Sequence, residues 1–188
     1  MARKRMFFTF KEAAERGPFD EYPVLPEEID PQLHLSRNDR VQPFYLDCGK
    51  DTVIVQMAGE GRVEFRDASV NFFDLEVGDF VYVPAGTLHR IHPDGENVTY
   101  RYRARQPGAE SLVWFCEGCG KELYRSDYDG NSVVVQTAYA DGCDGFNGST
   151  RTCAACGHVH PKIDLSAFRW REIAAELASQ EPVAAAHG

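Results

Sequence analysis

Two short cysteine motifs constrain the fold of this chain more than any other feature. Cys116-Glu-Gly-Cys119-Gly120 and Cys153-Ala-Ala-Cys156-Gly157 are two copies of the pattern C-x2-C-G, with 33 residues between them. The spacing lets both sulfurs of a pair face one ion, and the glycine that follows permits a tight turn whose N–H groups can hydrogen-bond the thiolates. Two such knuckles predict one Zn²⁺ or one iron held tetrahedrally by four sulfurs.

The predicted four-cysteine site is structural, because protein ligands fill all four positions and leave none for a substrate. Its binding energy would fold a region with little core of its own. Four free thiols are the alternative. Cys48 and Cys143 fall outside the pattern and are expected to be small buried or loop residues. His158 and His160 follow the last knuckle, and we expect them on the surface or in support of the cysteine ligands.

Charge and hydropathy exclude several classes of protein. The chain has 188 residues and a formal net charge of −9, whereas binding to nucleic acid requires a basic surface. No segment approaches the roughly 18 apolar residues that a membrane span requires. The apolar run at residues 7–10 is too short for the core of a signal peptide. We therefore expect a cytoplasmic protein with reduced cysteines, without nucleic-acid or membrane partners.

The order of local patterns predicts an all-β domain followed by a metal-binding subdomain. Residues 1–40 would form a helix with capping-box spacing at Thr9–Glu12 and an extended arm. Residues 41–113 carry turn signals every eight to twelve residues, the rhythm of a small barrel. Residues 114–161 contain the cysteines and a strand-like segment at 132–137. Residues 162–188 are expected to form a helix from Asp164 to Leu177, followed by a tail. The expected barrel strands include Thr52–Met57, Arg62–Arg66, Phe80–Val83 and Val98–Arg105.

A second motif identifies the kind of barrel. The segment from Gly78 to His89 matches the second cupin motif, G-x5-P-x-G-x2-H. Its glycines and Pro84 shape two turns that direct His89 into the barrel mouth. Upstream, the segment 55–59 resembles the end of the first cupin motif. The sequence therefore predicts a cupin, the jelly-roll barrel also called a double-stranded β-helix, with a C-terminal four-cysteine knuckle and a terminal helix.

The two motifs together resemble a known family. A cupin followed by Trp114-Phe-Cys-Glu-Gly-Cys-Gly and by Cys-Ala-Ala-Cys-Gly-His-Val-His-Pro161 resembles the bacterial 3-hydroxyanthranilate 3,4-dioxygenases, over about residues 40–161. Those proteins carry a rubredoxin-like iron, held by four cysteines, after the barrel. The resemblance implies the cupin fold, a homodimer, and descent from an enzyme that opens an aminophenol ring with non-haem Fe(II) and O2.

The resemblance fails at the catalytic iron. The family holds this iron by two His and one Glu, which leaves positions open for substrate and oxygen. His89 matches the last histidine, but the first His falls on Leu46 and the Glu falls on Thr52. Neither residue can replace its counterpart, so we expect a barrel without catalytic Fe(II). A gap or bulge would be needed to bring another donor to the site from the nearby candidates His34, Asp47, Cys48, Asp51 and His92.

The strand at residues 98–105 carries three arginines on one face. In the family register, an inward-facing Glu that binds substrate falls on Arg103. If Arg101 and Arg103 point inward beside His89, the cavity is cationic and suited to a carboxylate. In the alternative, Tyr100 and Tyr102 face inward and the arginines are solvated.

Three functions of different classes are therefore considered. The first is a divergent cupin enzyme that acts without the ancestral iron on a small anionic compound, a class that includes aromatic and amino-acid-derived molecules. His89 would be its general acid or base, Arg101 and Arg103 would hold the anion, and Gln56 and Thr52 would line the pocket. The second is a ring-cleaving dioxygenase in which His89 and non-standard ligands hold a metal. The third is a non-catalytic cupin that binds a small molecule.

Overall fold

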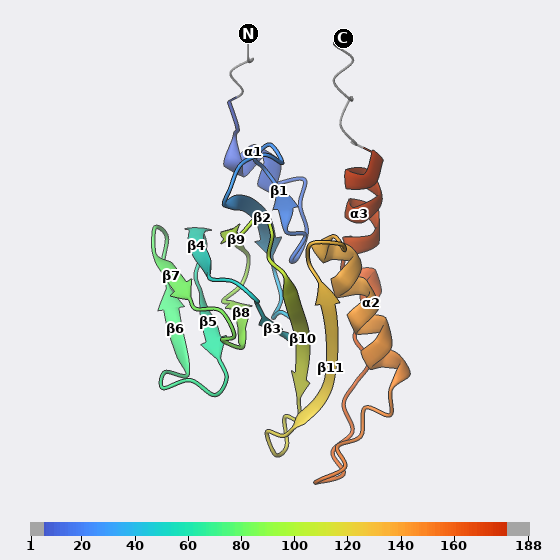
Figure 1. The fold of residues 1–188 in the computed structure, drawn as a ribbon. Helices are drawn as coiled ribbons and strands as arrows, with labels where there is room; N and C mark the ends of the chain where they lie inside the picture. Colours follow the sequence, from blue (N-terminus) through green and yellow to red (C-terminus); the bar gives the residue numbers. More distant parts are fainter. Residues whose placement is uncertain (1–5, 180–188) are drawn as a thin grey trace.

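Two antiparallel β-sheets that face each other form the body of the protein (Figure 1). The computed structural model describes residues 6–179. The first sheet has the strand order β1 (Tyr22–Pro23), β2 (Gln32–Asn38), β9 (Asn97–Arg103), β4 (Thr52–Ala58) and β7 (Phe80–Val83). The second has the order β11 (Glu122–Asp129), β10 (Ala109–Phe115), β3 (Tyr45–Asp47), β8 (His89–Pro93), β5 (Gly61–Phe65) and β6 (Phe72–Leu75).

Helices cover the ends and one side of this barrel. Helix α1 (Thr9–Ala13) precedes the strands, and α2 (Val135–Gly148), the 3-10 turn η1 (Leu165–Ala167) and α3 (Trp170–Ser179) follow them. Figure 1 shows α2 beside β11 and α3 beyond the C-terminal end of that strand, with the segment that joins the two helices running to the opposite end of β11. The prediction of an all-β cupin barrel with a C-terminal knuckle and a terminal helix is confirmed.

The inner face of the first sheet is polar. The register pairs Arg101 of β9 with His34 of β2 on one side and with Ile54 of β4 on the other, so these three residues form one layer of the barrel. Buried polar groups need partners within the protein, because an unpaired one is costly. The inner face therefore depends on its hydrogen bonds for stability. Its buried polar side chains are Gln32, Ser36, Asn38, Thr52, Gln56, Asn97, Thr99, Arg101 and Arg103.

An aromatic core joins the second sheet to the helices. The ring of Trp114 on β10 stacks on Phe146 of α2 with a centroid distance of 5.0 Å, and Phe44 contacts Tyr139 at 4.8 Å. Trp170 of α3 is buried, and its Nε1 donates a hydrogen bond of 2.9 Å to the carbonyl of Phe19. Burial of such rings contributes about 1.5–3 kcal/mol each. The core thus fixes the C-terminal helices and the segment around residue 19 against the barrel.

Helix α2 replaces the strand expected at residues 132–137. The β-branched run before residue 135 favours a strand, but the buried side chains of α2 continue at helical spacing through Tyr139, Cys143 and Phe146. The glycines inside the helix allow a close approach to the sheet. A Cβ at Gly142 would lie 2.5 Å from Leu112, and one at Gly145 would lie 2.3 Å from the Tyr124 hydroxyl. Tertiary packing therefore decides the conformation of this segment.

Two other predicted helices differ in detail. The N-cap of α1 is Phe8, without a side-chain cap, because the Thr9 hydroxyl bonds Tyr100 Oη at 2.5 Å instead. The helix predicted from Asp164 to Leu177 is divided into η1 and α3, since Asp164 caps the 3-10 turn through the Ser166 N–H and Phe168 is extended. The four barrel strands named above are present.

The predicted domain limits cut through the sheets. Strand β2 pairs with β9 in the first sheet, although it lies within the span expected to be an N-terminal arm. Strand β10 crosses the predicted limit between residues 113 and 114. Within residues 6–179, the helices are all too short or too polar to cross a membrane.

Candidate small-molecule site and metal centre

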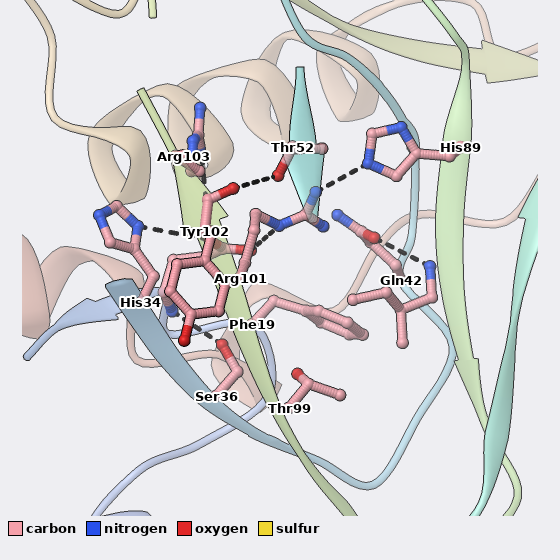
Figure 2. Close-up of polar contacts among 12 residues, drawn as sticks. Phe19, His34, Ser36, Gln42, Thr52, His89, Thr99, Arg101, Tyr102 and Arg103 are labelled. Carbon is pink, nitrogen blue, oxygen red and sulfur yellow. Dashed lines mark hydrogen bonds and ion pairs between the residues drawn. The ribbon is translucent and has the colours of Figure 1, made fainter. Parts of the chain in front are cut away.

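His89 lies at the centre of the barrel, fully buried, at the start of β8. Its Nδ1 is 2.8 Å from the carbonyl of Thr87, and its Nε2 is 2.7 Å from Nη1 of Arg101. Arginine can only donate, so Nε2 accepts this hydrogen bond and Nδ1–H donates to the carbonyl. Figure 2 shows the imidazole pointing toward the guanidinium. Both ring nitrogens of His89 are therefore engaged.

The other positions aligned with iron ligands hold no metal donor. Leu46 pairs with His89 across β3 and β8 and is fully buried in the apolar core. The Thr52 hydroxyl donates a hydrogen bond of 2.6 Å to the carbonyl of Tyr102 (Figure 2). One imidazole with both nitrogens engaged, one alkyl group and one hydroxyl do not fit an ion that requires two imidazoles and a carboxylate.

The nearby residues considered as substitute donors are placed elsewhere. Asp51 is exposed and accepts hydrogen bonds from the Tyr82 hydroxyl and the Ala85 N–H. Asp47 lies 3.5 Å from Arg125, and His92 lies 4.0 Å from Asp94. Cys48 is buried, and burial raises the pKa of its thiol to about 12. Only His34 of this group faces the buried network described next.

The carboxylate of Glu21 lies between Arg101 and Arg103, the two arginines predicted to face into the barrel. Arg101 is 2% exposed, and its Nε donates a hydrogen bond of 2.9 Å to Oε1 of Glu21. Oε2 of the same carboxylate lies 3.4 Å from Nδ1 of His34 and 3.9 Å from Nη1 of Arg103. Arg103 also donates to Glu110, which accepts a further hydrogen bond of 2.7 Å from Tyr128. The arginines face inward, but two carboxylates balance their charge.

An irregular segment delivers Glu21 to this position. Phe19 and Glu21 both have left-handed backbone conformations, with φ of 54° and 45°, which are costly for residues other than glycine. Hydrogen bonds hold the segment: the Phe19 N–H donates to Asn38, the Glu21 N–H donates to Ser36, and Gln136 donates to two carbonyls of the segment. Strand β2 and helix α2, far apart in the sequence, thus fix this carboxylate inside the barrel.

Burial and charge set the protonation of the network. Burial would raise the pKa of Glu21, but Arg101 and the contact with His34 lower it to about 2, so the carboxylate is ionised. Burial, followed by repulsion from Arg101, lowers the pKa of His89 to about 3. Burial also lowers the pKa of His34, although Glu21 opposes this effect. At neutral pH the network therefore contains two cations, two anions and two neutral imidazoles.

A cavity of about 690 Å³ opens beside this network. Arg103 lines it, together with His34, Glu21, Glu110 and Tyr128. Arg101, His89, Thr52 and Gln56 are not among its lining residues. Gln56 instead donates a hydrogen bond of 2.9 Å to the carbonyl of Ala58 and is fully buried in another layer of the barrel. Of the five barrel residues singled out in the sequence, the structure brings Arg103 to the cavity.

The four cysteines converge as their spacing predicts. Their Sγ atoms all lie within 4.8 Å of one another, with Cys116 3.5 Å from Cys156 and Cys119 3.5 Å from Cys153. Four sulfurs about 2.3 Å from one ion would lie about 3.8 Å apart, so the donors fit a tetrahedral Zn²⁺ or iron. Both knuckle glycines are left-handed, Gly120 with φ of 76° and Gly157 with φ of 75°.

Backbone N–H groups stabilise the thiolate of Cys153 in the second knuckle. Hydrogen bonds from the N–H groups of Ala155 and Cys156 lower the pKa of Cys153 to about 6. Cys143, in contrast, is buried in α2, and burial raises the pKa of its thiol. The knuckle is therefore suited to hold a cation, whereas the cysteine outside the pattern is a core residue.

Comparisons with known proteins find similar sequences. The AraC-like ligand binding domain matches residues 51–132. The 3-hydroxyanthranilate 3,4-dioxygenase of Paraburkholderia phytofirmans is 28% identical over 121 residues, which cover 62% of this chain and 70% of that protein. The protein of the same name from Ruegeria pomeroyi is 28% identical over 146 residues, which cover 72% of this chain and 77% of that protein. The chain has a cupin fold and is similar to these 3-hydroxyanthranilate 3,4-dioxygenases.

Two solved structures are similar at lower sequence identity. A cupin-2 domain containing protein from Shewanella frigidimarina is 18% identical and covers 53% of this chain and 93% of its own, with a TM-score of 0.46. The hydroquinone 1,2-dioxygenase PnpCD, solved with Cd²⁺ and 4-hydroxybenzonitrile, is 20% identical and covers 50% of this chain and 69% of its own, with a TM-score of 0.45.

The sequence did not reveal Glu21 and Glu110 as partners of the arginines in this cupin. Glu21 stands in a segment rich in Pro, Asp and Glu that gives no sign of turning inward. The even alternation of the β10 segment places Glu110 on the same face as Leu112 and Trp114, which are both buried. A carboxylate at an inward position of a strand is a signal for a buried cation, and it was the one available clue.

Proposed function

We propose that this cupin acts on a small anionic compound by proton transfer, in the cavity beside Arg103 and without iron in the barrel. The hydrogen bond from Arg101 to Nε2 of His89 carries this proposal. A nitrogen that accepts a hydrogen bond at 2.7 Å from a cation has no free lone pair for a metal. The guanidinium also repels a cation that approaches the imidazole. The chain therefore provides its own fixed cation where the related dioxygenase reaction would need iron.

Arg103 is the anion-binding group of the proposal. Its Nη2 is paired with Glu110, while its Nη1 is buried without a hydrogen-bond partner among the described residues and lies 3.9 Å from Glu21. Unpaired buried donors are unfavourable, so an acceptor oxygen from a ligand would stabilise this nitrogen. Arg101, which does not line the cavity, is a positioning residue that holds Glu21 and His89.

His34 is the proton-transfer group of the proposal, in preference to His89. His34 lines the cavity, whereas His89 does not, has both ring nitrogens engaged and has a pKa of about 3. The groups around His34 are Glu21, Arg103 and Arg101. Their charges are balanced when Glu110 is counted with Arg103, so a bound anion would raise the pKa of His34 and promote uptake of a proton. The protonated imidazole beside the anion can then donate this proton, taken up from solvent, to the substrate.

A homodimer in the cytoplasm completes the proposal. Large apolar side chains are exposed on the edge strands, with Phe80 68% and Tyr82 53% exposed on β7 and Phe73 48% exposed on β6. Burial of this surface against a second copy would remove it from water. The four-cysteine site also needs reduced thiols, which the cytoplasm maintains. Analytical ultracentrifugation of the full chain and of Phe80→Lys tests the dimer: the substitution should yield monomers.

Thermal protection by a matched pair of ligands tests the anion site. 2-Aminobenzoate should raise the melting temperature of the protein, and the neutral 2-aminobenzamide should not. The double variant Arg103→Met with Glu110→Gln removes both charges of the buried pair and should abolish the protection, whereas Arg125→Met on the outer face of β11 should retain it. Equal protection by the amide, or protection that survives in the double variant, would refute the proposed site.

The pH dependence of the same binding tests the role of His34. If binding takes up one proton at His34, the affinity for 2-aminobenzoate depends on pH between two limits, the pKa of His34 in the complex and its lower pKa in the free protein. Between these limits the affinity rises by up to about tenfold for each pH unit that the pH falls. His34→Gln should bind with little change between pH 8 and pH 6. An unchanged pH dependence in this variant would assign the proton to another group.

A further inference from the structure

We propose that Glu117, His158 and His160 form a second metal site, distinct from the four-cysteine site and from the barrel, for a first-row divalent ion. One carboxylate oxygen of Glu117 and one ring nitrogen of each histidine all lie within 4.8 Å of one another. Ligands of a single Zn²⁺ or Fe²⁺ lie about 3–4 Å apart, since each bond is about 2.0–2.2 Å long. Glu117 and His158 are exposed, so small rotations of their side chains close the remaining gap.

The cysteine knuckles bring these three residues together. Glu117 follows Cys116 directly, and His158 follows Cys156 by two positions. The Cys153 N–H donates a hydrogen bond of 2.9 Å to the carbonyl of His158, and an isolated bridge between residues 152 and 159 fixes the segment that carries both histidines. The ion held by the cysteines would therefore also fix the backbone of the second site. This coupling reduces the entropy cost of assembling the three ligands.

His160 gives the observation that points to a ligand. It is 6% exposed, and its Nε2 is buried with no hydrogen-bond partner among residues 6–179. Its ring lies 4.6 Å from that of His158 in an edge-to-face arrangement. A buried imidazole nitrogen without a partner costs free energy, because it has lost its hydrogen bond to water. Metal binding to this residue would offset that cost.

The first knuckle leaves room for His158. A Cβ at Gly118 would lie 3.3 Å from Cβ and 3.5 Å from Cγ of His158, which is tighter than most side-chain contacts. The glycine between Glu117 and Cys119 therefore lets the imidazole lie over the loop that carries Glu117. This close approach places a donor from the second knuckle against the first.

The donor set and the surrounding charge favour a divalent cation. Two imidazoles and one carboxylate suit Zn²⁺ or Fe²⁺ and leave coordination positions open. Four thiolates around a divalent ion carry a net negative charge, which attracts a second cation nearby. Glu117 and His160 also line a cavity of about 430 Å³ together with Arg66 and Arg90. An ion at this site would be accessible to water or to a small anion, which the two arginines would attract.

Binding of Co²⁺ to the full chain, loaded with Zn²⁺ at the cysteines, tests the proposal. We expect one equivalent of Co²⁺ to bind and to show ligand-field absorption without the intense sulfur-to-cobalt charge-transfer band of a thiolate site. Glu117→Gln, His158→Gln and His160→Gln should each weaken Co²⁺ binding about tenfold or more. The controls are Glu76→Gln and His92→Gln, which change the same residue types outside the group and should bind as the unmodified chain does.

Zinc content, measured in the same samples, separates this site from support of the cysteines. The three variants should keep one Zn²⁺ per chain and an unchanged melting temperature before Co²⁺ is added. Three results would overturn the proposal: no Co²⁺ binding to the unmodified chain, a charge-transfer band that reports displacement of Zn²⁺ from the cysteines, or loss of the cysteine-bound Zn²⁺ in the histidine variants. The last result would make His158 and His160 supports of the cysteine site.

Discussion

The barrel interior and the cysteine knuckle differ in whether their donor atoms are available to a metal ion. In the knuckle, four donors converge on one point and their sulfurs contact one another at 3.5 Å. In the barrel, His89 is bonded to Arg101, which is bonded in turn to Glu21. The comparison shows that the knuckle brings together four sulfur donors that fit a cation, whereas the barrel imidazole is already paired with a guanidinium. In our proposal, this guanidinium takes the place of an external cation.

The same comparison explains how each region is stabilised. Residues 116–121 and 149–163 of the knuckle contain little regular structure beyond one isolated bridge, so an ion bound to the four sulfurs would add order there. The barrel has an apolar core on one side, and its polar side holds a charge-balanced network of two arginines and two glutamates. Such a network is stable only while every member keeps its partner.

The largest effect is expected from loss of a knuckle ligand. Cys116→Ser should release the metal and destabilise the protein by several kcal/mol, because structural Zn²⁺ contributes about 10–16 kcal/mol of apparent binding free energy in small zinc domains. Thermal unfolding and metal analysis measure both effects. The control is Cys143→Ala, which leaves a cavity in α2 and should destabilise the fold without release of metal. Full metal content in Cys116→Ser would contradict a four-cysteine site.

Glu21 should have the next largest effect. Glu21→Gln leaves Arg101 without its ionised partner and is expected to cost about 3–5 kcal/mol, as breaking a buried ion pair does. Adding Arg101→Met should recover part of this loss, which a double-mutant cycle measures from chemical unfolding. Glu172→Gln, which breaks an exposed pair with Arg169, should have little effect. Additive losses at positions 21 and 101 would show that the two residues are not coupled.

The free energy of unfolding should depend on pH in a way that reports the buried, neutral imidazole of His89. The pKa of His89 is about 3 in the folded protein and near 6.5 in the unfolded chain. The unfolded state therefore binds the proton first, and the stability contributed by this group is complete above pH 6.5 and is lost as the pH falls toward 3. His89→Gln should flatten this slope, which for one proton is at most about 1.4 kcal/mol per pH unit.

The window between pH 6.5 and about 5.5 is the most informative for this comparison, because Glu21 stays ionised there in both the folded and the unfolded state. His92→Gln, which removes a histidine outside the buried network, serves as the control and should leave the slope close to that of the unmodified chain. An equal slope in the unmodified protein and in His89→Gln would mean that His89 is not held neutral by burial and Arg101.

Local patterns in the sequence predicted the barrel and the knuckle, but not the contacts that fill the barrel. The paired C-x2-C-G spacing acts over a few residues, so the cysteines converge as expected. His89 lies on its barrel strand, but it is fully buried and not at the barrel mouth where the cupin motif led us to expect it. The alternation of β9 limited its arginines to one face without showing which face is buried. The deciding partner, Glu21, comes from a left-handed turn about 80 residues away, and no local pattern encodes that contact.

Helix α2 is a part of the fold that local sequence patterns also did not predict. Its first residues favour a strand by propensity, and its glycines suggest a loop. The fit of Gly142 against Leu112 and of Gly145 against Tyr124 makes the helix the favoured conformation. The exposed His158 and buried His160 were likewise expected to be surface or supporting residues, because their proximity to Glu117 depends on the two knuckles meeting in space.

Iron content after reconstitution tests the central claim, that Arg101 takes the place of a metal at His89. The full chain and His89→Gln are each incubated anaerobically with Fe²⁺, freed of unbound metal and analysed for iron and zinc per chain. The account predicts equal metal content in the two proteins. One equivalent of iron that is present in the unmodified chain and absent from His89→Gln, with the cysteine-bound metal unchanged in both, would contradict it.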